Sequence, residues 1–266
     1  MTSMHGILPA QELELAIRET REIRATEPIA DEQVQPASLD LRLGPVAYRV
    51  RASFMPGKHA TVEERLVTLT MHKMDIREGG VLERGGGYTG PLYAEVSPRT
   101  FSVLVRKGTR LTQLRIRRGA QGASDTDMRR LQQEERVVDA AIASTDIRDG
   151  VPVTVDVRGD RSDGIIGYRA KHHAGLIDVD RVRAYEVADF WETVHAPREG
   201  GLILDPAEFY ILASREPVKV PPTYAAEMIA YDTLVGEFRV HYAGFFDPGF
   251  GHPAGGSQGA RAVLEV

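Results

Sequence analysis

Short runs in which apolar and polar residues alternate recur along this chain, and glycine or proline separates many of them. Alternation with a period of two is typical of a strand with one buried face, whereas an amphipathic helix repeats its apolar residues every three or four positions. Many short strands at close spacing are typical of an all-β barrel or sandwich. The pattern therefore predicts a mainly β protein with a few short helices.

The expected strands cover residues 36–44, 48–54, 92–96, 101–105, 111–116, 151–157, 202–204, 209–212, 218–220, 238–242 and 262–265. Helical spacing of apolar residues predicts helices over 9–23, 125–142 and 179–191. The polar helix 125–142 is a candidate connector between two domains. We therefore expect a first domain over 1–120, a helical connector over 121–148 and a second domain over 149–266.

Composition excludes several kinds of protein. The 266 residues carry a net charge of -5, which argues against non-specific binding to nucleic acid. The chain contains no cysteine, so it has no disulfides and none of the Cys-ligated zinc sites of the zinc deaminases. No basic stretch with a long apolar run opens the chain, and no apolar run approaches the roughly 20 residues that cross a membrane. We expect a cytoplasmic protein that binds no membrane.

The two halves of the chain show a short internal similarity. Residues 79–84 align with 200–205, and residues 87–96 align in two blocks with 249–266. Either chance or an internal repeat explains matches of this length. If the repeat is real, the first copy is shortened near residues 85–87, where three glycines follow one another.

The turn 246–251 and the strand that ends in Glu265 are the clearest candidates for chemistry. Proline fixes φ and glycine permits positive φ, so Asp247, Gly249 and their neighbours turn tightly and can approach a flat ligand, with Phe250 as a stacking face. An ordinary β-turn with a buried Phe is the alternative. A carboxylate between Leu264 and Val266 is costly to bury unless it is paired or used as a base, but for a lone Glu the pattern favours a side chain that points outward.

Two other groups of polar residues have more than one interpretation. On a strand, Ser38, Asp40 and Arg42 share one face and could bind a phosphate or a sugar, or could form a salt-bridged solvent face. Consecutive residues on a strand point to opposite faces, so His172 and His173 are not expected to share a metal ion. We predict no metal ligands in the protein itself.

These motifs, in this order, resemble the dCTP deaminase family of the dUTPase-like superfamily, in a long form with two copies of the fold. Residues 246–250 and 262–266 look like that family's product-binding turn and catalytic strand. Residues 35–44 look like its opening motif, and residues 108–114 look like its late Gly-Gln motif. The resemblance covers nearly the whole chain.

The resemblance implies two tandem distorted β-barrel domains that assemble as a trimer or pseudo-trimer. It implies hydrolytic deamination of dCTP to dUTP without zinc, with Mg2+ accompanying the triphosphate, and it leaves open whether dTTP is also a partner. Glu265, and by repeat Glu95, take the role of the glutamate that activates water. The residues expected at the substrate are Asp247, Gly249, Phe250, Ser38, Asp40, Arg42, Tyr88, Arg110 and Gln113.

The chain departs from the family pattern in two places. The family's Ser-Ser-x-x-Arg motif is not found in the corresponding stretch 230–236, and the sequence ends one residue after Glu265. We therefore expect a second domain shortened at its C-terminus. Two alternatives to the deaminase stay open: a dUTP pyrophosphatase of the same superfamily, and a relative that binds nucleotides without turnover.

Overall fold

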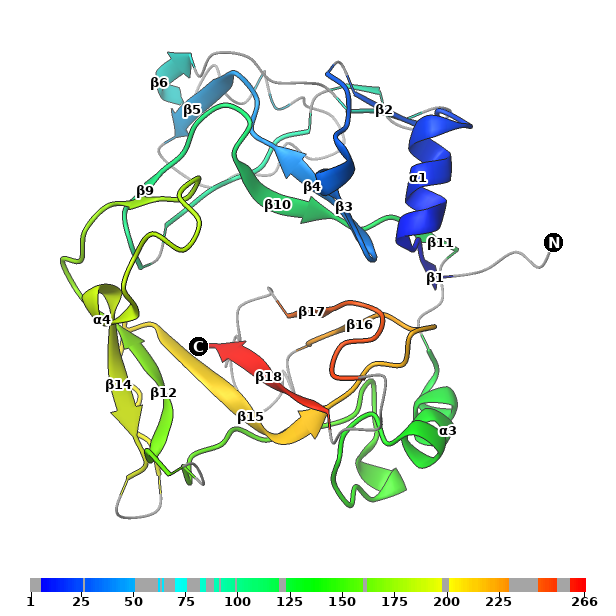
Figure 1. Cartoon of the computed structure of the whole chain (residues 1–266), viewed down its shortest axis with the longest axis vertical. Coiled ribbons are helices and arrows are strands. Elements are labelled where there is room, and N and C mark those ends of the chain that lie inside the picture. The colour runs from blue at the N-terminus through cyan, green and yellow to red at the C-terminus, as the bar shows by residue number, and fades with distance from the viewer. Residues whose placement is uncertain are drawn as a thin grey trace.

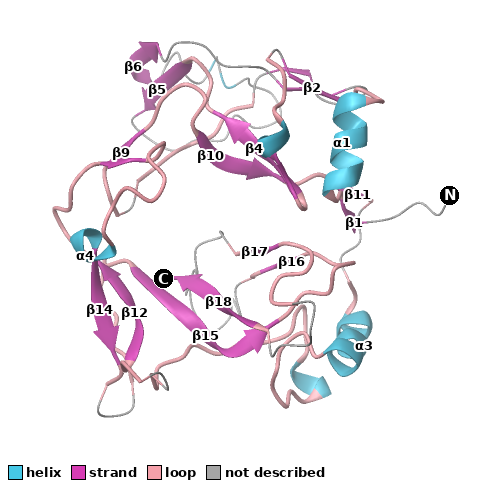
Figure 2. Cartoon of the chain, in the orientation of Figure 1, coloured by secondary structure: helices cyan, strands magenta, loops and turns pink. Residues whose placement is uncertain are grey.

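A computed structural model describes residues 6–25, 27–50, 62, 64, 70–75, 82–84, 89–90, 92–98, 100–119, 123–159, 162–197, 201–229, 244–252 and 259–266. Strands predominate over helices in this part of the chain, which confirms the expected mainly β fold (Figure 2). The described strands of the two halves form separate sheets, apart from one short pairing between the halves. No helix among the described residues is long and apolar enough to cross a membrane.

In the first half the elements are β1 (Gly6–Ile7), α1 (Ala10–Arg18), β2 (Ile23–Ala25), the 3-10 turn η1 (Asp31–Gln33), β3 (Val34–Gln35), β4 (Ser38–Arg42), β5 (Val46–Val50), β6 (Thr70–Asp75), β7 (Leu82–Arg84), β8 (Thr89–Gly90), β9 (Val103–Leu104), β10 (Arg110–Leu114) and β11 (Arg117–Arg118). Between the halves lie α3 (Asp125–Glu135) and the 3-10 turn η2 (Ser144–Asp146). The second half contains β12 (Ile165–Ala170), β13 (Ile177–Asp178), α4 (Val187–Phe190), β14 (Trp191–His195), β15 (Tyr210–Val218), β16 (Ala226–Glu227), β17 (Phe245–Phe246) and β18 (Ala260–Glu265).

Helix α1 forms much of the core of the first half. Pro9 occupies its N-cap position, and Leu13 and Ala16 are buried on the face that packs with Leu39 of β4. The helix ends at Arg18, so the predicted extent to residue 23 was too long. Ile23 belongs to β2, which pairs with β7. Its buried side chain packs into the same core as Leu13 and Ala16.

The predicted strand 36–44 is present as β4. It lies between β3 and β10 in an antiparallel sheet, and Leu39 stands opposite Leu114 while Asp40 stands opposite Gln113. Leu39 is 1% exposed, whereas Asp40 is half-buried. This alternation places Asp40 and Gln113 next to each other.

Helix α3 covers the start of the predicted helix 125–142 and is shorter than it. Ser124 and Asp127 form a capping box at its start, and Arg136 ends it in a left-handed conformation with φ 49°. Beyond the helix, Val138 is held by the side chain of Gln132 and bridges to Val218. Val138 is therefore buried by a sheet contact and not by a helical face.

The main sheet of the second half has the order β14-β12-β15-β18 and is antiparallel throughout. Along β18, Ala262 and Leu264 face the core, whereas Arg261 and Val263 are exposed on the other face. The register with β15 shifts between Ala213 and Pro217. Strands β12 and β14 were not predicted, since glycine and charged residues interrupt their apolar pattern.

Several other predicted elements are absent from the described residues or shorter than expected. Residues 92–96 and 202–204 form no strand, residues 151–157 make only an isolated bridge at Val155, and the predicted helix 179–191 is reduced to α4. The predicted strand 238–242 lies outside the described residues.

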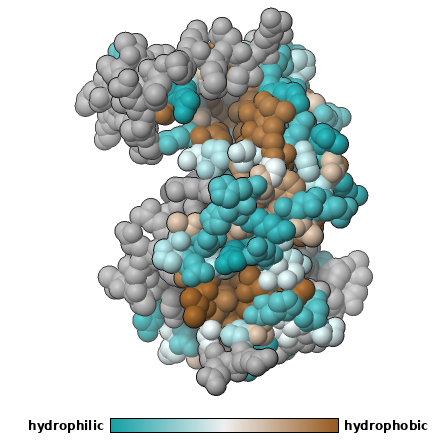
Figure 3. Space-filling view, turned by 90° about the vertical axis from the view of Figure 1, so that its left-hand side faces the viewer, coloured by the Kyte–Doolittle hydropathy of each residue, from teal (hydrophilic) through white to brown (hydrophobic). Residues whose placement is uncertain are grey.

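The two halves meet through β9, labelled at the left of Figure 1, and β13, which pairs with it in parallel. Beside them, Arg106 forms ion pairs with Asp178 at 2.6 Å and with Asp180 at 3.1 Å. Phe101 packs edge-on against Phe190 and Trp191. Figure 3 views the molecule from the side of this contact, where hydrophilic side chains gather across the middle of the face.

Candidate active site

The turn 246–251 is fixed to the second half by its backbone. The Phe250 amide donates to the Asp247 carbonyl at 3.0 Å, and the Gly249 amide donates to the Val220 carbonyl at 3.1 Å. The Val220 amide donates in return to the Phe250 carbonyl at 2.7 Å. Gly249 and Gly251 both have positive φ, as the sequence predicted for a tight turn. The turn is therefore a rigid element placed by Val220, which is 1% exposed.

The ring of Phe250 is engaged in packing. It lies 4.8 Å from the ring of Phe246, centroid to centroid, at an interplanar angle of 53°. Both rings pack against the buried cluster of Val138, Val218 and Ala262. Phe250 is half-buried, so the description of an ordinary turn with a packed Phe fits the structure, and a ligand could use only the part of the ring left accessible.

Glu265 ends strand β18 opposite Ile211 of β15. Strand alternation puts it on the face opposite Ala262 and Leu264, and it is half-buried there. In the described part of the chain its carboxylate makes no hydrogen bond and no ion pair. The carboxylate is therefore available for a ligand or a water molecule.

The turn 246–251 packs against the start of β18, the strand that Glu265 ends. A Cβ added to Gly251 would stand 2.7 Å from the Ala260 amide nitrogen, so the end of the turn packs against the start of β18. Glu265 lies five residues further on, about 16 Å along an extended strand. No hydrogen bond or ion pair between described residues joins Glu265 to Asp247.

Asp247 is held by an arginine from the first half. Arg115, between β10 and β11, places its Nη2 3.3 Å from Asp247 Oδ1 and its Nη1 3.3 Å from the Ala226 carbonyl oxygen. Its guanidinium lies 4.1 Å from the centroid of the Phe245 ring. Burial lowers the pKa of Arg115, while the charges of Asp247 and Glu227 oppose that shift.

Arg115 was missed by the sequence analysis. It follows the late Gly-Gln motif directly, and that position was its only available signal. Nothing in the local pattern indicates a contact with a turn more than 100 residues away, because only the tertiary fold brings the two together.

Three of the predicted binding residues in the first half lie close together. Asp40 accepts a hydrogen bond from Gln113 at 3.1 Å, and Arg110 lies 3.5 Å from its other carboxylate oxygen. Gln35 donates to that same oxygen at 3.2 Å. These polar groups are thus satisfied by one another in a small network at the β4–β10 pairing.

Ser38 and Arg42 are not part of this network. Ser38 is 1% exposed, and Arg42 donates to the Pro28 carbonyl at 2.7 Å. The three residues Ser38, Asp40 and Arg42 therefore do not converge on one point, because the loop before η1 takes up the Arg42 guanidinium.

The counterpart of the turn and strand in the first half is only partly described. Glu95 lies in an exposed segment, 92–98, without strand structure, and Leu92 and Val96 are exposed beside it. Tyr88 lies outside the described residues, as do Gly85, Gly86 and Gly87. Glu95 therefore does not stand in the same setting as Glu265.

Comparison with known proteins relates both halves to one family. Residues 124–266 match the C-terminal domain of 2'-deoxycytidine 5'-triphosphate deaminase, and residues 4–86 and 85–120 match its N-terminal domain. The crystal structure of 2'-deoxycytidine 5'-triphosphate deaminase from Agrobacterium tumefaciens superposes with a TM-score of 0.86 at 41% sequence identity. The alignment covers 98% of this chain and 92% of that chain. No curated protein sequence matches.

This chain is a member of the dCTP deaminase family. The resemblance stated from the sequence motifs is thereby confirmed, and so is the fold class. The N-terminal match of the family falls into two segments that meet at residues 85–86, where the sequence analysis placed a shortened copy. The domain boundaries themselves stay a prediction.

Among the described residues, no group of three or more His, Cys, Asp or Glu side chains could hold a metal ion. His172 and His173 lie in a turn after β12, not on a strand, and His172 Nε2 is 2.7 Å from Glu208 Oε1.

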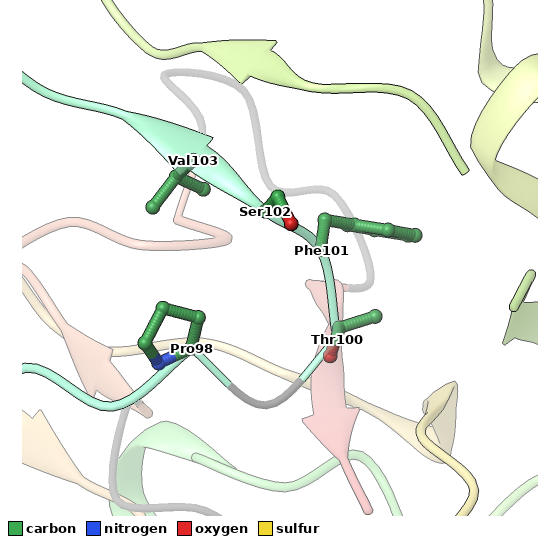
Figure 4. Close-up of a pocket in the computed structure, with 5 residues that line it drawn as sticks. All are labelled: Pro98, Thr100, Phe101, Ser102 and Val103. Atoms are coloured by element: carbon green, nitrogen blue, oxygen red, sulfur yellow. The ribbon is translucent and has the colours of Figure 1, made fainter. Parts of the chain in front are cut away.

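Figure 4 shows a pocket of about 360 Å³ next to β9, lined by Pro98, Thr100, Phe101, Ser102 and Val103. None of the residues that the dCTP deaminase motifs single out lines it. We therefore do not assign it to the reaction.

Proposed function

We propose that this protein deaminates dCTP hydrolytically, giving dUTP and ammonia for the synthesis of pyrimidine deoxynucleotides. The observation that carries the proposal is Glu265, which ends β18 in the family's C-terminal domain with a half-buried carboxylate that has no partner among the described residues. A carboxylate at such a position can act as a general base. Membership of the dCTP deaminase family supplies the substrate class.

The reaction needs one base that first accepts and then returns a proton. Glu265 takes a proton from a water molecule, whose oxygen then bonds to C4 of the cytosine ring while the C4–N3 π electrons move to N3. Protonated Glu265 returns the proton to the N4 amino group. The C4–N4 bond then breaks, the electron pair on N3 re-forms the C4–N3 double bond and ammonia leaves, and transfer of the hydroxyl proton to N3 gives uracil. Glu265 thus serves both steps and is regenerated as a carboxylate, and the overall change is that of a hydrolase.

The turn 246–251 holds the deoxyribose and the base in this proposal. Asp247 offers a carboxylate that is 43% exposed, and Gly249 allows the backbone to approach the ligand. Phe250 contributes the accessible part of its ring. The fixed backbone of the turn supports this role, because a preformed site loses less entropy on binding.

The polar residues of the first half are proposed to bind the triphosphate. Arg110 is 46% exposed and Gln113 lies beside it, so both can exchange a contact with Asp40 for one with a phosphate oxygen. On the family resemblance alone, Ser38 and Arg42 are proposed as further polar contacts of the opening motif, with Arg42 exchanging its bond to the Pro28 carbonyl for one to the ligand. Tyr88 and Glu95 are proposed, on the sequence repeat alone, as the counterparts of Phe250 and Glu265 in the first copy.

Mg2+ is proposed to arrive with the triphosphate. This ion commonly binds through substrate phosphates and one or two carboxylates and needs no cage of protein ligands. Zinc-independent chemistry is proposed because the chain has no cysteine to form the zinc site of other deaminases.

Further proposals concern assembly and location. Self-association into a trimer or pseudo-trimer is proposed from the family resemblance, dTTP binding is proposed as an open question of regulation, and a cytoplasmic location is proposed from the sequence. Light scattering of the purified protein, with and without dTTP, tests the first two of these proposals.

The activity is tested by incubating the purified protein with dCTP and Mg2+ and separating the products by ion-exchange chromatography. Formation of dUTP with one ammonia per turnover supports the proposal. Release of dUMP and pyrophosphate from dUTP, without deamination of dCTP, would instead identify a dUTP pyrophosphatase. Thermal stabilisation by dCTP without turnover would identify a relative that only binds nucleotides, and the proposal would be wrong.

A further inference from the structure

Arg115 links the first half of the chain to the turn proposed to hold the nucleotide. It lies in the short segment between β10 and β11, and its guanidinium contacts Asp247 and the Ala226 carbonyl of the second half. Its side chain is 9% exposed, so it is enclosed between the halves. Phe245 covers the guanidinium plane at 4.1 Å.

The contacts of Arg115 satisfy only part of the hydrogen-bonding capacity of its guanidinium. Both of its hydrogen bonds are 3.3 Å long, beyond the usual range of 2.7–3.2 Å. Its Nε is buried and has no hydrogen-bond partner, and no other side-chain nitrogen or oxygen in the described residues shares both properties. Leaving a charged donor unsatisfied costs stability, and an apolar side chain of similar size commonly fills such a place as well. Folding stability alone is therefore a poor explanation for an arginine here.

The carboxylate of Asp247 is held by one oxygen only. Oδ1 faces Arg115, whereas Oδ2 has no partner among the described residues, and the side chain is 43% exposed. An anchored carboxylate with one uncommitted oxygen is suited to accept a hydrogen bond from a ligand hydroxyl in a defined direction.

We infer that Arg115 is a positioning residue, which orients Asp247 from the opposite half so that the first half helps to form the nucleotide site of the second. This inference rests on the proposed function of the turn. Arg115 touches no reacting atom in this arrangement and acts through Asp247.

The test compares Arg115→Met and Arg115→Lys with a matched control, Arg117→Met. Arg117 also reaches the second half, at 4.0 Å from Glu227, but it is 43% exposed and contacts β16. We expect Arg115→Met to raise KM for dCTP about tenfold or more, with kcat within about threefold, because it weakens ground-state binding. Arg115→Lys should fall between it and the parent, and Arg117→Met should stay within about twofold.

A double-mutant cycle with Asp247→Asn separates positioning from general loss of structure. If Arg115 acts through Asp247, Arg115→Met should raise KM by less than about twofold once Asp247→Asn is present. Independent, multiplicative effects of the two substitutions would overturn the inference.

A measurement without substrate keeps the inference distinct from the proposed function. Hydrogen exchange of the Gly249 and Phe250 amides, which bond to Val220 and Asp247, should be faster in Arg115→Met and unchanged in Arg117→Met. An inactive parent protein would overturn the proposed function. Unchanged exchange in a folded Arg115→Met, or in Arg115→Lys should the first variant not fold, would overturn the positioning role.

Discussion

The carboxylate of Glu265 lies between Leu264, which is buried, and Val266 at the end of the sheet. Replacing it with Gln keeps the shape and removes the base. We expect Glu265→Gln to lower kcat for dCTP by about 10²–10⁴-fold and to leave nucleotide binding within a few-fold. Steady-state deamination and titration calorimetry measure the two quantities.

Glu14→Gln is a matched control, because Glu14 is exposed on α1 in the first half. It should leave both quantities unchanged. Full activity of Glu265→Gln would show that another group accepts the proton from water.

The two glycines of the turn differ in what surrounds them. At Gly251, with φ 61°, an added Cβ would meet the Val218 carbonyl oxygen at 2.2 Å; at Gly249, with φ 86°, it would meet nothing within 4 Å. Gly249→Ala should cost about 1–2 kcal/mol from backbone strain, and Gly251→Ala at least about 1 kcal/mol more. Urea unfolding measures both. Equal losses would contradict the close packing of the turn on β15.

Single residues also show how far sequence reasoning reached. The motifs located Asp40, Arg110 and Gln113, and the β4–β10 register brings them within hydrogen-bonding distance. Arg115 was missed because its partner Asp247 is distant in sequence, and no periodicity encodes such a pair. The sequence left the orientation of Phe250 open, because the sequence of a turn does not determine which distant residues its side chains pack against.

At the level of elements, an ion pair with a buried carboxylate holds β18 in place in addition to its strand pairing with β15. Asp156 is 1% exposed, and Arg261 of β18 donates to its carboxylate. Burial raises the pKa of Asp156, but hydrogen bonds from the Arg158 and Gly159 amides and from Arg261 outweigh it, so the pKa lies below its ordinary value. The stabilisation is therefore present above about pH 4, the unfolded value, and is lost as pH falls through the lower folded value.

Removing the arginine should weaken this arrangement. Arg261→Met is expected to lower the free energy of unfolding at pH 7 by about 1–3 kcal/mol, a range discounted for the partial exposure of Arg261. Acid unfolding should begin at a higher pH, because the hydrogen bond and the charge of Arg261 no longer help to keep the pKa of Asp156 low. Circular dichroism during acid titration checks this, with the exposed Arg215→Met as control. An unchanged acid transition would contradict the role of the pair.

The sequence predicted a helix or strand correctly where the tertiary structure also supplies that segment with a neighbouring element. The alternation of 36–44 became β4 because β3 and β10 flank it. The similar alternation of 92–96 did not become a strand, since a strand needs a neighbour to satisfy its backbone and the described residues provide none there. The helix predicted over 125–142 stops early because Gln132 holds the backbone of Val138 and ends the helical path.

For the whole molecule, the contact between halves contains the single tryptophan of the chain. Trp191 lies 5.2 Å from the ring of Phe101 and 6.1 Å from that of Phe209, and Phe101 alone of these three belongs to the first half. We expect Phe101→Ala to cost about 1–3 kcal/mol, less than for a fully buried ring, and to shift Trp191 emission to longer wavelength. Urea unfolding followed by fluorescence measures both. Unchanged emission would indicate that the halves do not meet through these rings in solution.

The sequence motifs led to the two-copy family, but not to the residues that join the copies. The Arg106 guanidinium pairs with Asp178 and Asp180 of the second half, and these ion pairs depend on the parallel pairing of β9 and β13. Parallel pairing between short strands leaves almost no periodic signal, because each strand contains only two residues.

The same pairing has a consequence for synthesis on the ribosome. Arg106 and Asp178 are 72 positions apart, so the β9 edge of the first half is made well before its partner exists. At about 5–20 residues per second, translation leaves that edge waiting for roughly 4–14 seconds. During this interval an unpaired strand edge is open to other nascent chains. Ribosome pausing between these positions should therefore raise the fraction of aggregated protein.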